Sequence, residues 1–131
     1  MREVYEFLKQ SGVFYIATDD NGQPRVRPFG AICVFENKLY IMTSNQKPVY
    51  KQLEKNPNAE ISSMTPDGRW IRLSAEVVRD ERFEARRAML DANPDLRRMY
   101  SEDDGKIEVL FLKNAKAVIC SFTAAPETYA F

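Results

Sequence analysis

The chain has 131 residues, of which 44% are apolar, and this supplies enough side-chain volume for the core of one domain. Its 19 basic and 19 acidic residues cancel, so we expect no nucleic-acid partner, because non-specific binding of that kind needs a broad positive field. The chain has no histidine, which excludes Ser-His-Asp, Cys-His and histidine-zinc mechanisms. Any chemistry must then use carboxylate and lysine groups or a bound cofactor.

The N-terminal residues lack the apolar core of a signal peptide, and no stretch reaches the roughly eighteen apolar residues of a membrane span. We therefore expect a cytoplasmic protein with no membrane partner. The two cysteines, Cys33 and Cys120, are far apart in the sequence, and each lies in an apolar run. We interpret them as buried free thiols rather than as a disulfide or redox pair.

The first half of the chain is expected to form two short helices and three strands. Asn21-Gly22 is a strong signal for a hairpin, and Gly30 permits a bend within the strand that follows. Because tight turns separate the first three strands, they are expected to form an antiparallel meander. In chain order the patterns predict a helix over 2–10, strands over 13–18, 23–35 and 38–43, and a helix over 48–55.

The second half is expected to be strand-rich with one longer helix. Asp80 is a suitable N-cap for that helix, and Asn93-Pro94 ends it. The tail after residue 122 contains Tyr129 and Phe131, which suggests that it packs against the core. The patterns predict strands over 59–64 and 70–78, a helix over 81–92, a short helical turn over 96–100, and one long or two short strands within 107–122.

These elements predict a mainly β protein with helical inserts, built as one domain over residues 1–131. A small antiparallel barrel is favoured over a sandwich, because hairpin turns recur along the chain and closure hides strand edges. The expected fold is a six-stranded antiparallel β-barrel.

The segment from Thr43 to Pro48 is the first candidate site. The hydroxyls of Thr43 and Ser44, the N–H groups of a helix start and the ammonium group of Lys47 together suit a phosphate dianion. Lys51 lies one helical turn further on. Taken alone, the same pattern also fits a well-started, solvated helix.

A second basic group strengthens the phosphate interpretation. Arg25 and Arg27 are two residues apart, so both guanidinium groups lie on one face of their strand, which the meander places beside the strand that ends at Thr43. The alternative is a solvated strand face paired with carboxylates. Pro28 marks an edge or bulge, because it cannot donate to a strand ladder. Met42 and Trp70 either line a flat ring or belong to the core.

The sequence resembles the pyridoxamine 5′-phosphate oxidase-like, FMN-binding split-barrel superfamily, especially its short members grouped with nitroimidazole-resistance proteins. The resemblance is carried by Gln23–Gly30, Lys38–Ser44 and Lys47–Asn58. The chain is much shorter than the vitamin-synthesising oxidases and lacks their C-terminal segment that holds the substrate. It also lacks the active-site histidine often described in nitroimidazole-resistance proteins.

The resemblance implies a homodimer with FMN bound at the subunit interface. The basic strand carrying Arg25 and the helix start would hold the phosphate. Carried over by position, the following residues form the cofactor site: Arg27, Pro28 and Phe29 along the flavin, Met42, Thr43 and Ser44 along the ribityl-phosphate, and Lys47 and Lys51 at the phosphate.

The leading functional hypothesis is an FMN-dependent oxidoreductase that acts on an unidentified small molecule, with the flavin carrying the electrons. A flavin-binding or redox-sensing protein without turnover is the second. A binder of a deazaflavin or of haem on the same fold is the third. For haem the missing histidine leaves cysteine or tyrosine as the iron ligand.

Overall fold

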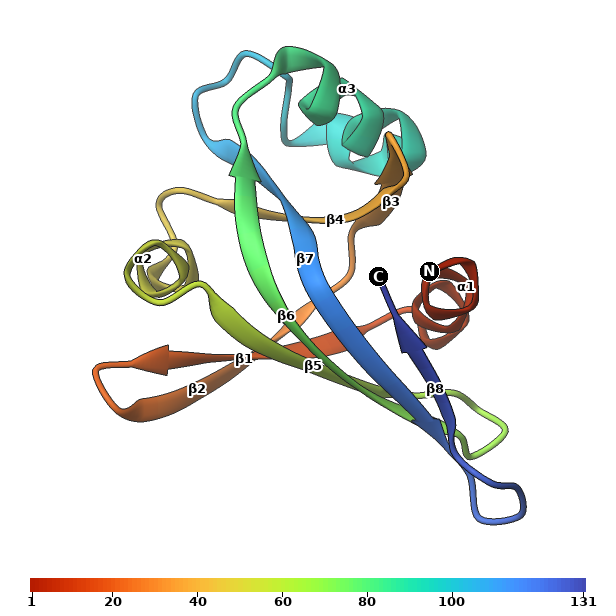
Figure 1. The fold of residues 1–131 in the computed structure, drawn as a ribbon. Helices are drawn as coiled ribbons and strands as arrows, with labels where there is room; N and C mark the ends of the chain where they lie inside the picture. Colours follow the sequence, from red (N-terminus) through yellow and green to blue (C-terminus); the bar gives the residue numbers. More distant parts are fainter.

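A computed structural model describes residues 1–131 (Figure 1). The antiparallel sheet has eight strands, so the mainly β class is as expected, but the strand count is higher than six. The elements in chain order are α1 (Arg2–Ser11), β1 (Phe14–Asp20), β2 (Gln23–Phe29), β3 (Ile32–Phe35), β4 (Lys38–Ser44), α2 (Pro48–Lys55), β5 (Asn58–Met64), β6 (Trp70–Asp80), α3 (Phe83–Ala92), the 3₁₀ helix η1 (Pro94–Arg98), β7 (Ile107–Cys120) and β8 (Glu127–Ala130).

Two departures from the expected elements account for the extra strands. The strand expected over 23–35 is interrupted at Gly30-Ala31 and becomes β2 and β3. The C-terminal tail forms β8, which pairs with the second half of β7, and Phe131 exchanges both backbone hydrogen bonds with Ala115. The expectation that the tail packs against the molecule is therefore confirmed, and the 107–122 segment is one long strand.

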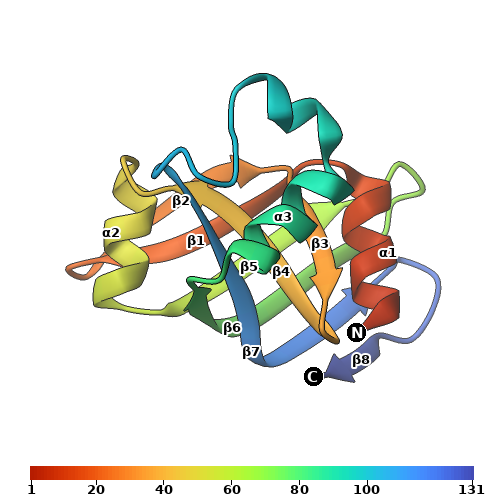
Figure 2. The ribbon, with the colours of Figure 1, turned by 90° about the horizontal axis from the view of Figure 1, so that it is seen from above.

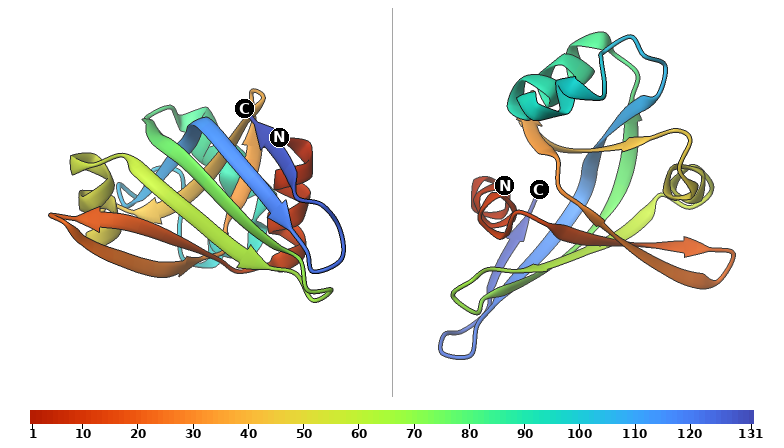
Figure 3. Two further views of the ribbon diagram at one scale, coloured as in Figure 1. Left: turned by 60° about the horizontal axis from the view of Figure 1, so that its bottom comes forward. Right: turned by 180° about the vertical axis from the view of Figure 1, so that it is seen from behind.

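The hydrogen-bonded order of the sheet is β2-β1-β5-β6-β7-β4-β3. Its two edge strands, β2 and β3, follow each other in the sequence and are joined only by Gly30-Ala31, yet no ladder pairs them. The sheet therefore curls round until its edges meet at one end and stay apart along their length (Figures 1 and 3). We call this opening the split.

The expected meander of the first three strands is wrong. β1 pairs with β2 and β3 pairs with β4 as hairpins, but β4 takes β7 as its other neighbour. The strand carrying Arg25 and Arg27 is thus not adjacent to the one ending at Thr43. Turn residues in the sequence predict where the hairpins lie, but they do not predict which strands become neighbours when the hairpins join one sheet.

The main core fills the inside of the curled sheet and contains 21 buried residues. Strand alternation sends Phe14, Ile16, Leu39 and Ile41 inward, where α1 adds Leu8. A smaller cluster, which includes Tyr40 and Met89, lies on the other face of β3 and β4, and α3 covers that face (Figure 2). None of the helices is long and apolar enough to cross a membrane.

The cysteines are both free, as expected, but they differ in burial. Cys33 is buried beneath α3, and desolvation raises the pKa of its thiol to about 12. Cys120 is only partly buried, so the expectation of two buried thiols holds for Cys33 alone. A thiol with so high a pKa is a poor nucleophile at neutral pH, so Cys33 serves packing.

Asp80 organises the start of α3 in a way that differs from the expected cap. The helix begins at Phe83 with Arg82 in the N-cap position, and Asp80 belongs to the end of β6. The buried Asp80 carboxylate accepts hydrogen bonds from Tyr40 Oη at 2.7 Å and from Arg82 Nε and Nη2 at 3.0 and 2.9 Å. The Arg82 bonds, followed by the Tyr40 bond, hold the pKa of Asp80 well below its usual range against the opposing effect of burial.

The substitution Asp80→Asn is expected to lower the free energy of unfolding by about 2 kcal/mol at neutral pH, because it removes a charged acceptor from four donors, the three above and the backbone N–H of Arg82 at 3.1 Å. Because the folded-state pKa is depressed, the wild-type stabilisation is complete above the ordinary carboxyl value of 3.8 and is lost as the pH falls below it. Urea unfolding from pH 7 to pH 2 measures both effects.

The exposed Glu84 forms no ion pair and interacts only with the dipole of the first turn of α3, so Glu84→Gln is the control and should shift the urea midpoint far less than Asp80→Asn. Equal pH dependence of wild type and Asp80→Asn would contradict this account of the Asp80 cluster.

Candidate functional site

A cavity of about 490 Å³ lies at the split. One wall comes from the end of β2, the connection to β3, the end of β4 and the residue before α2. The other wall comes from the end of α3, η1 and the residues after it. The first wall contains Pro28, Phe29, Gly30, Ala31, Met42, Thr43 and Lys47, and the second contains Ala92, Asn93, Pro94, Asp95, Leu96, Met99 and Tyr100.

Several predicted site residues meet in this cavity although their strands are not neighbours. Pro28 and Phe29 reach it from the end of β2, and Met42, Thr43 and Lys47 reach it from the end of β4 and the following loop. The cause is the curl of the sheet, which brings its edges together at the Gly30-Ala31 connection. The predicted grouping therefore holds for these five residues, but through closure of the sheet and not through pairing of the strands.

Thr43 carries a polar atom that the protein leaves without a partner. Its residue is only 5% exposed, and its Oγ1 has no hydrogen-bond partner. A buried hydroxyl without a partner costs about 1–3 kcal/mol, and such groups are rare in folded proteins. Thr43 is one of the residues that line the cavity, but its Oγ1 is closed off from solvent, so the side chain would have to rotate before this hydroxyl could bond to a ligand.

Lys47, the residue before α2, lines the same cavity. Lys47 occupies the N-cap position, Pro48 the first helical position, and no side chain caps the helix. The first turn of a helix carries free N–H groups and a partial positive charge, which favour an anion. Lys47 is exposed and forms no ion pair, so its ammonium group is available to the same anion.

The remaining predicted residues on this segment lie outside the cavity lining. Ser44 is buried, and its Oγ accepts a hydrogen bond from the backbone N–H of Gln46 at 3.2 Å, so this hydroxyl braces the loop. Lys51 is exposed on α2 and forms no ion pair. It remains free to approach a ligand at the start of the helix.

The two arginines of β2 have different surroundings, and neither lines the cavity. Arg25 forms an exposed ion pair with Asp20 at 3.1 Å, which matches the alternative of a solvated strand face. Arg27 is partly buried and donates to Thr18 Oγ1 at 2.7 Å and to Gln52 Oε1 at 2.6 Å. Burial and then the charge of Arg25 lower the pKa of Arg27, whose guanidinium still remains charged.

The second wall of the cavity was missed by sequence reasoning. It consists of the Ala92–Tyr100 region, whose sequence is typical of a helix end followed by a turn. Its position is set by a long-range contact in which Asn93 Nδ2 donates to the carbonyl of Ile32 at 3.1 Å. The sequence carried no signal for this wall, because the exposure of Met99 and its place at the cavity appear only in the folded chain.

The cavity therefore has one cationic end and one mainly apolar wall. The cationic end combines the ammonium group of Lys47 with an uncapped helix start. The wall opposite presents Leu96, Met99 and other apolar side chains, together with Asn93 and the carboxylate of Asp95. Such an arrangement suits a ligand with an anionic end and a flat apolar body.

Comparisons with known proteins identify the relatives of this chain. The family model described as pyridoxamine 5′-phosphate oxidase matches residues 1–117. The chain belongs to the pyridoxamine 5′-phosphate oxidase-like family. A search of functionally curated proteins gave no match.

Solved structures agree with the family assignment. A NimC/NimA family protein from Clostridium acetobutylicum is 48% identical, with a TM-score of 0.98 over 100% of this chain and 92% of its own. At 13% identity, an FMN-binding, pyridoxamine 5′-phosphate oxidase-related protein from Nostoc punctiforme has a TM-score of 0.62 over 99% of this chain and 95% of its own. A heme binding protein from Mycobacterium smegmatis, 18% identical, has a TM-score of 0.76 over 95% of this chain and 55% of its own.

These structures confirm the resemblance and the split-barrel class inferred from the sequence. In this chain the barrel is an eight-stranded sheet that does not close by hydrogen bonds. The two matches below 25% identity establish the fold alone.

The unpartnered hydroxyl of Thr43 leads to a direct prediction. Thr43→Val keeps the side-chain shape and removes the orphaned group, so the ligand-free protein should be as stable as wild type or up to about 1 kcal/mol more stable. Its affinity for FMN should fall about tenfold, because the ligand loses one hydrogen bond. Thermal melting and flavin fluorescence titration measure the two effects.

Ser63 provides a matched control, since its Oγ is the other buried side-chain atom without a partner and it does not line the cavity. Ser63→Ala should leave FMN affinity unchanged. An FMN affinity of Thr43→Val equal to that of wild type would show that this hydroxyl does not face the ligand.

Proposed function

We propose that this protein is an FMN-binding flavoprotein that acts as an oxidoreductase on a small molecule. The observation that carries the proposal is the cavity of about 490 Å³ in which Lys47, at the uncapped start of α2, lies opposite mainly apolar side chains. A phosphate monoester attached to a flat ring system satisfies both ends of that cavity. The bound flavin would supply the electron transfer, while the protein supplies position, charge and shape.

The residues of the cavity fit the parts of FMN in a consistent order. Lys47, Lys51 and the first turn of α2 would hold the phosphate, with Arg27 as a further cation. Thr43 would bind the ribityl-phosphate portion. Pro28 and Phe29 would lie along the ring, together with the apolar side chains of the opposite wall.

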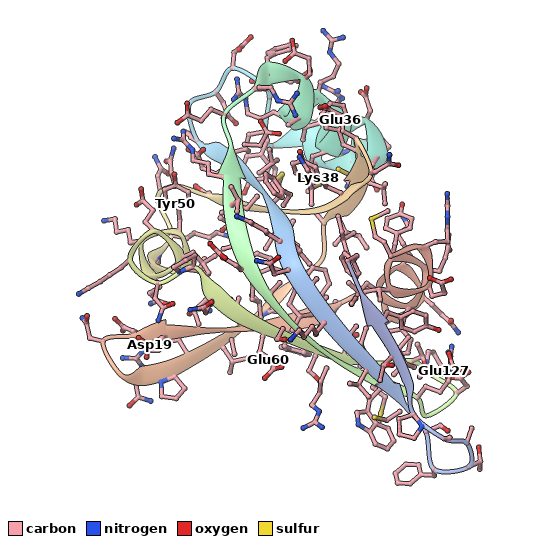
Figure 4. The ribbon with its side chains drawn as sticks, viewed as in Figure 1. Asp19, Glu36, Lys38, Tyr50, Glu60 and Glu127 are labelled. Atoms are coloured by element: carbon pink, nitrogen blue, oxygen red, sulfur yellow. The ribbon has the colours of Figure 1, made fainter.

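We further propose that two copies form a homodimer that covers the cavity. The outer face of β1, β2, β5 and β6 has no helix over it (Figure 3), and Figure 4 places Glu60 on this side of the sheet. Tyr15, Val26 and Met64 are 50%, 67% and 58% exposed on this face. Tyr15 is paired with Pro28, so the apolar face reaches the rim of the cavity.

A second copy seated on this face would shield these side chains and close the open side of the site. Sedimentation at working concentration should then show a dimer. A monomer would contradict this part of the proposal.

Haem is the second candidate, because the heme binding protein from Mycobacterium smegmatis has the same fold. The donor set favours FMN. Lys47, Lys51 and an uncapped helix start suit a phosphate, whereas the chain has no histidine for the iron. A flavin-binding protein without turnover would hold the same cofactor in the same cavity, but a nicotinamide donor would not reduce it.

A visible spectrum of the purified protein, reconstituted with FMN where necessary, tests the proposed function. The two-banded absorption of an oxidised flavin is expected, with bleaching by NADH or NADPH and reoxidation by a nitro-compound or a quinone. Flavin bands without bleaching would support the protein without turnover. A Soret band, or no binding of FMN, would contradict the proposal.

The double variant Arg27→Ala with Lys51→Ala is expected to lose bound FMN while its sheet remains folded. Both cations would act on the phosphate, and neither belongs to the buried core. Flavin content after gel filtration and far-UV circular dichroism measure the two outcomes. Arg2→Ala with Lys9→Ala, on the exposed side of α1, removes the same charge elsewhere and should retain FMN. Unchanged flavin content in the first variant would show that the phosphate lies elsewhere.

A further inference from the structure

Arg27 is held by neutral groups alone, as Arg86 also is. It forms no ion pair, and its guanidinium bonds go to neutral acceptors. By contrast, carboxylates lie within 3.1 Å of a guanidinium nitrogen in Arg25, Arg69, Arg79, Arg82 and Arg97. The charge of Arg27 is therefore uncompensated within the chain.

The neutral acceptors form a compact cluster with Arg27. Nη2 donates to Gln52 Oε1 at 2.6 Å, and Nη1 donates to Thr18 Oγ1 at 2.7 Å and to the carbonyl of Ile16 at 3.2 Å. Thr18 Oγ1 in turn donates to Gln52 Oε1 at 2.6 Å. Thr18 is only 4% exposed, so β1 fixes the base of the cluster.

The cluster connects two elements that border the cavity, although Arg27 itself is not among the residues that line it. Arg27 precedes Pro28, a cavity residue of β2, and Gln52 lies on α2, whose N-cap Lys47 is also a cavity residue. A glutamine at position 52 orients the guanidinium through its amide oxygen and leaves the positive charge intact. A carboxylate there would orient it equally well but would neutralise it.

We propose that Gln52 is a positioning residue which, with Thr18, holds Arg27 in place as an uncompensated cation for the phosphate end of the cofactor. This inference rests on the FMN-binding function proposed above. According to this inference, ligand binding needs an uncharged side chain at position 52, and a hydrogen bond to Arg27 alone is not enough. A purely structural link between α2 and β2 would work as well, or better, with glutamate.

The substitution Gln52→Glu separates these two roles. If the charge of Arg27 matters, the variant should bind FMN about tenfold more weakly than wild type, while its affinity for riboflavin, which lacks the phosphate, should be unchanged. Its melting temperature should equal or exceed that of wild type, because a charged hydrogen bond replaces a neutral one. Fluorescence titration at low and high salt measures both affinities.

Gln10→Glu is the matched control. Gln10 Oε1 also accepts a hydrogen bond from an arginine, Arg69 Nη2 at 3.2 Å, but on α1 and outside the cavity. This variant adds the same negative charge and should bind FMN as wild type does. Gln52→Ala, which frees Arg27 without neutralising it, should also weaken FMN binding more than riboflavin binding.

The outcomes distinguish this inference from the proposed function. Wild-type FMN affinity in Gln52→Glu would overturn the role of Gln52 while leaving FMN binding in place. An equal loss for FMN and riboflavin would also overturn it, since that pattern indicates a general disturbance of the site. Wild-type protein that binds no FMN would overturn the proposed function itself.

Discussion

The structure depends on one constraint at Gly30-Ala31, where two residues join the opposite edge strands of one sheet. A connection this short forces the edges of β2 and β3 together at one end, while the absence of a ladder between them leaves the split. The sheet curls around an apolar core as a result, and residues at the ends of β2 and β4 meet at the opening. This closure forms one wall of the cavity, and the segment from the end of α3 to Tyr100, inserted between β6 and β7, forms the other.

Polar and cationic groups gather at one end of the split, and the fold alone does not require this arrangement. Apolar residues fill the inward positions of β4 before Thr43, and a valine would continue that pattern. The chain instead places there a hydroxyl without a partner, next to an uncapped helix start and a free lysine. Local costs of this kind are characteristic of binding sites, where a ligand supplies the missing contacts.

Local signals in the sequence predicted most of the elements and part of the site. Asn21-Gly22 located the first hairpin, and Pro48 located the start of α2. The order of the strands could not be predicted, because it depends on contacts between residues far apart in the chain, such as the pairing of β4 with β7. For the same reason Gln52 gave no signal: its bond to Arg27 exists only after α2 packs against β1 and β2. The position of Asn93 against Ile32, which sets the second wall, is equally non-local.

The central claim is that the cationic end of the cavity recognises a phosphate attached to a flavin. Calorimetric titration of the flavin-free protein with FMN and then with riboflavin tests it most directly. The account predicts saturable FMN binding at one per chain, with riboflavin about a hundredfold weaker because it lacks the charged group. Equal affinities for the two flavins, or no binding of either, would contradict it.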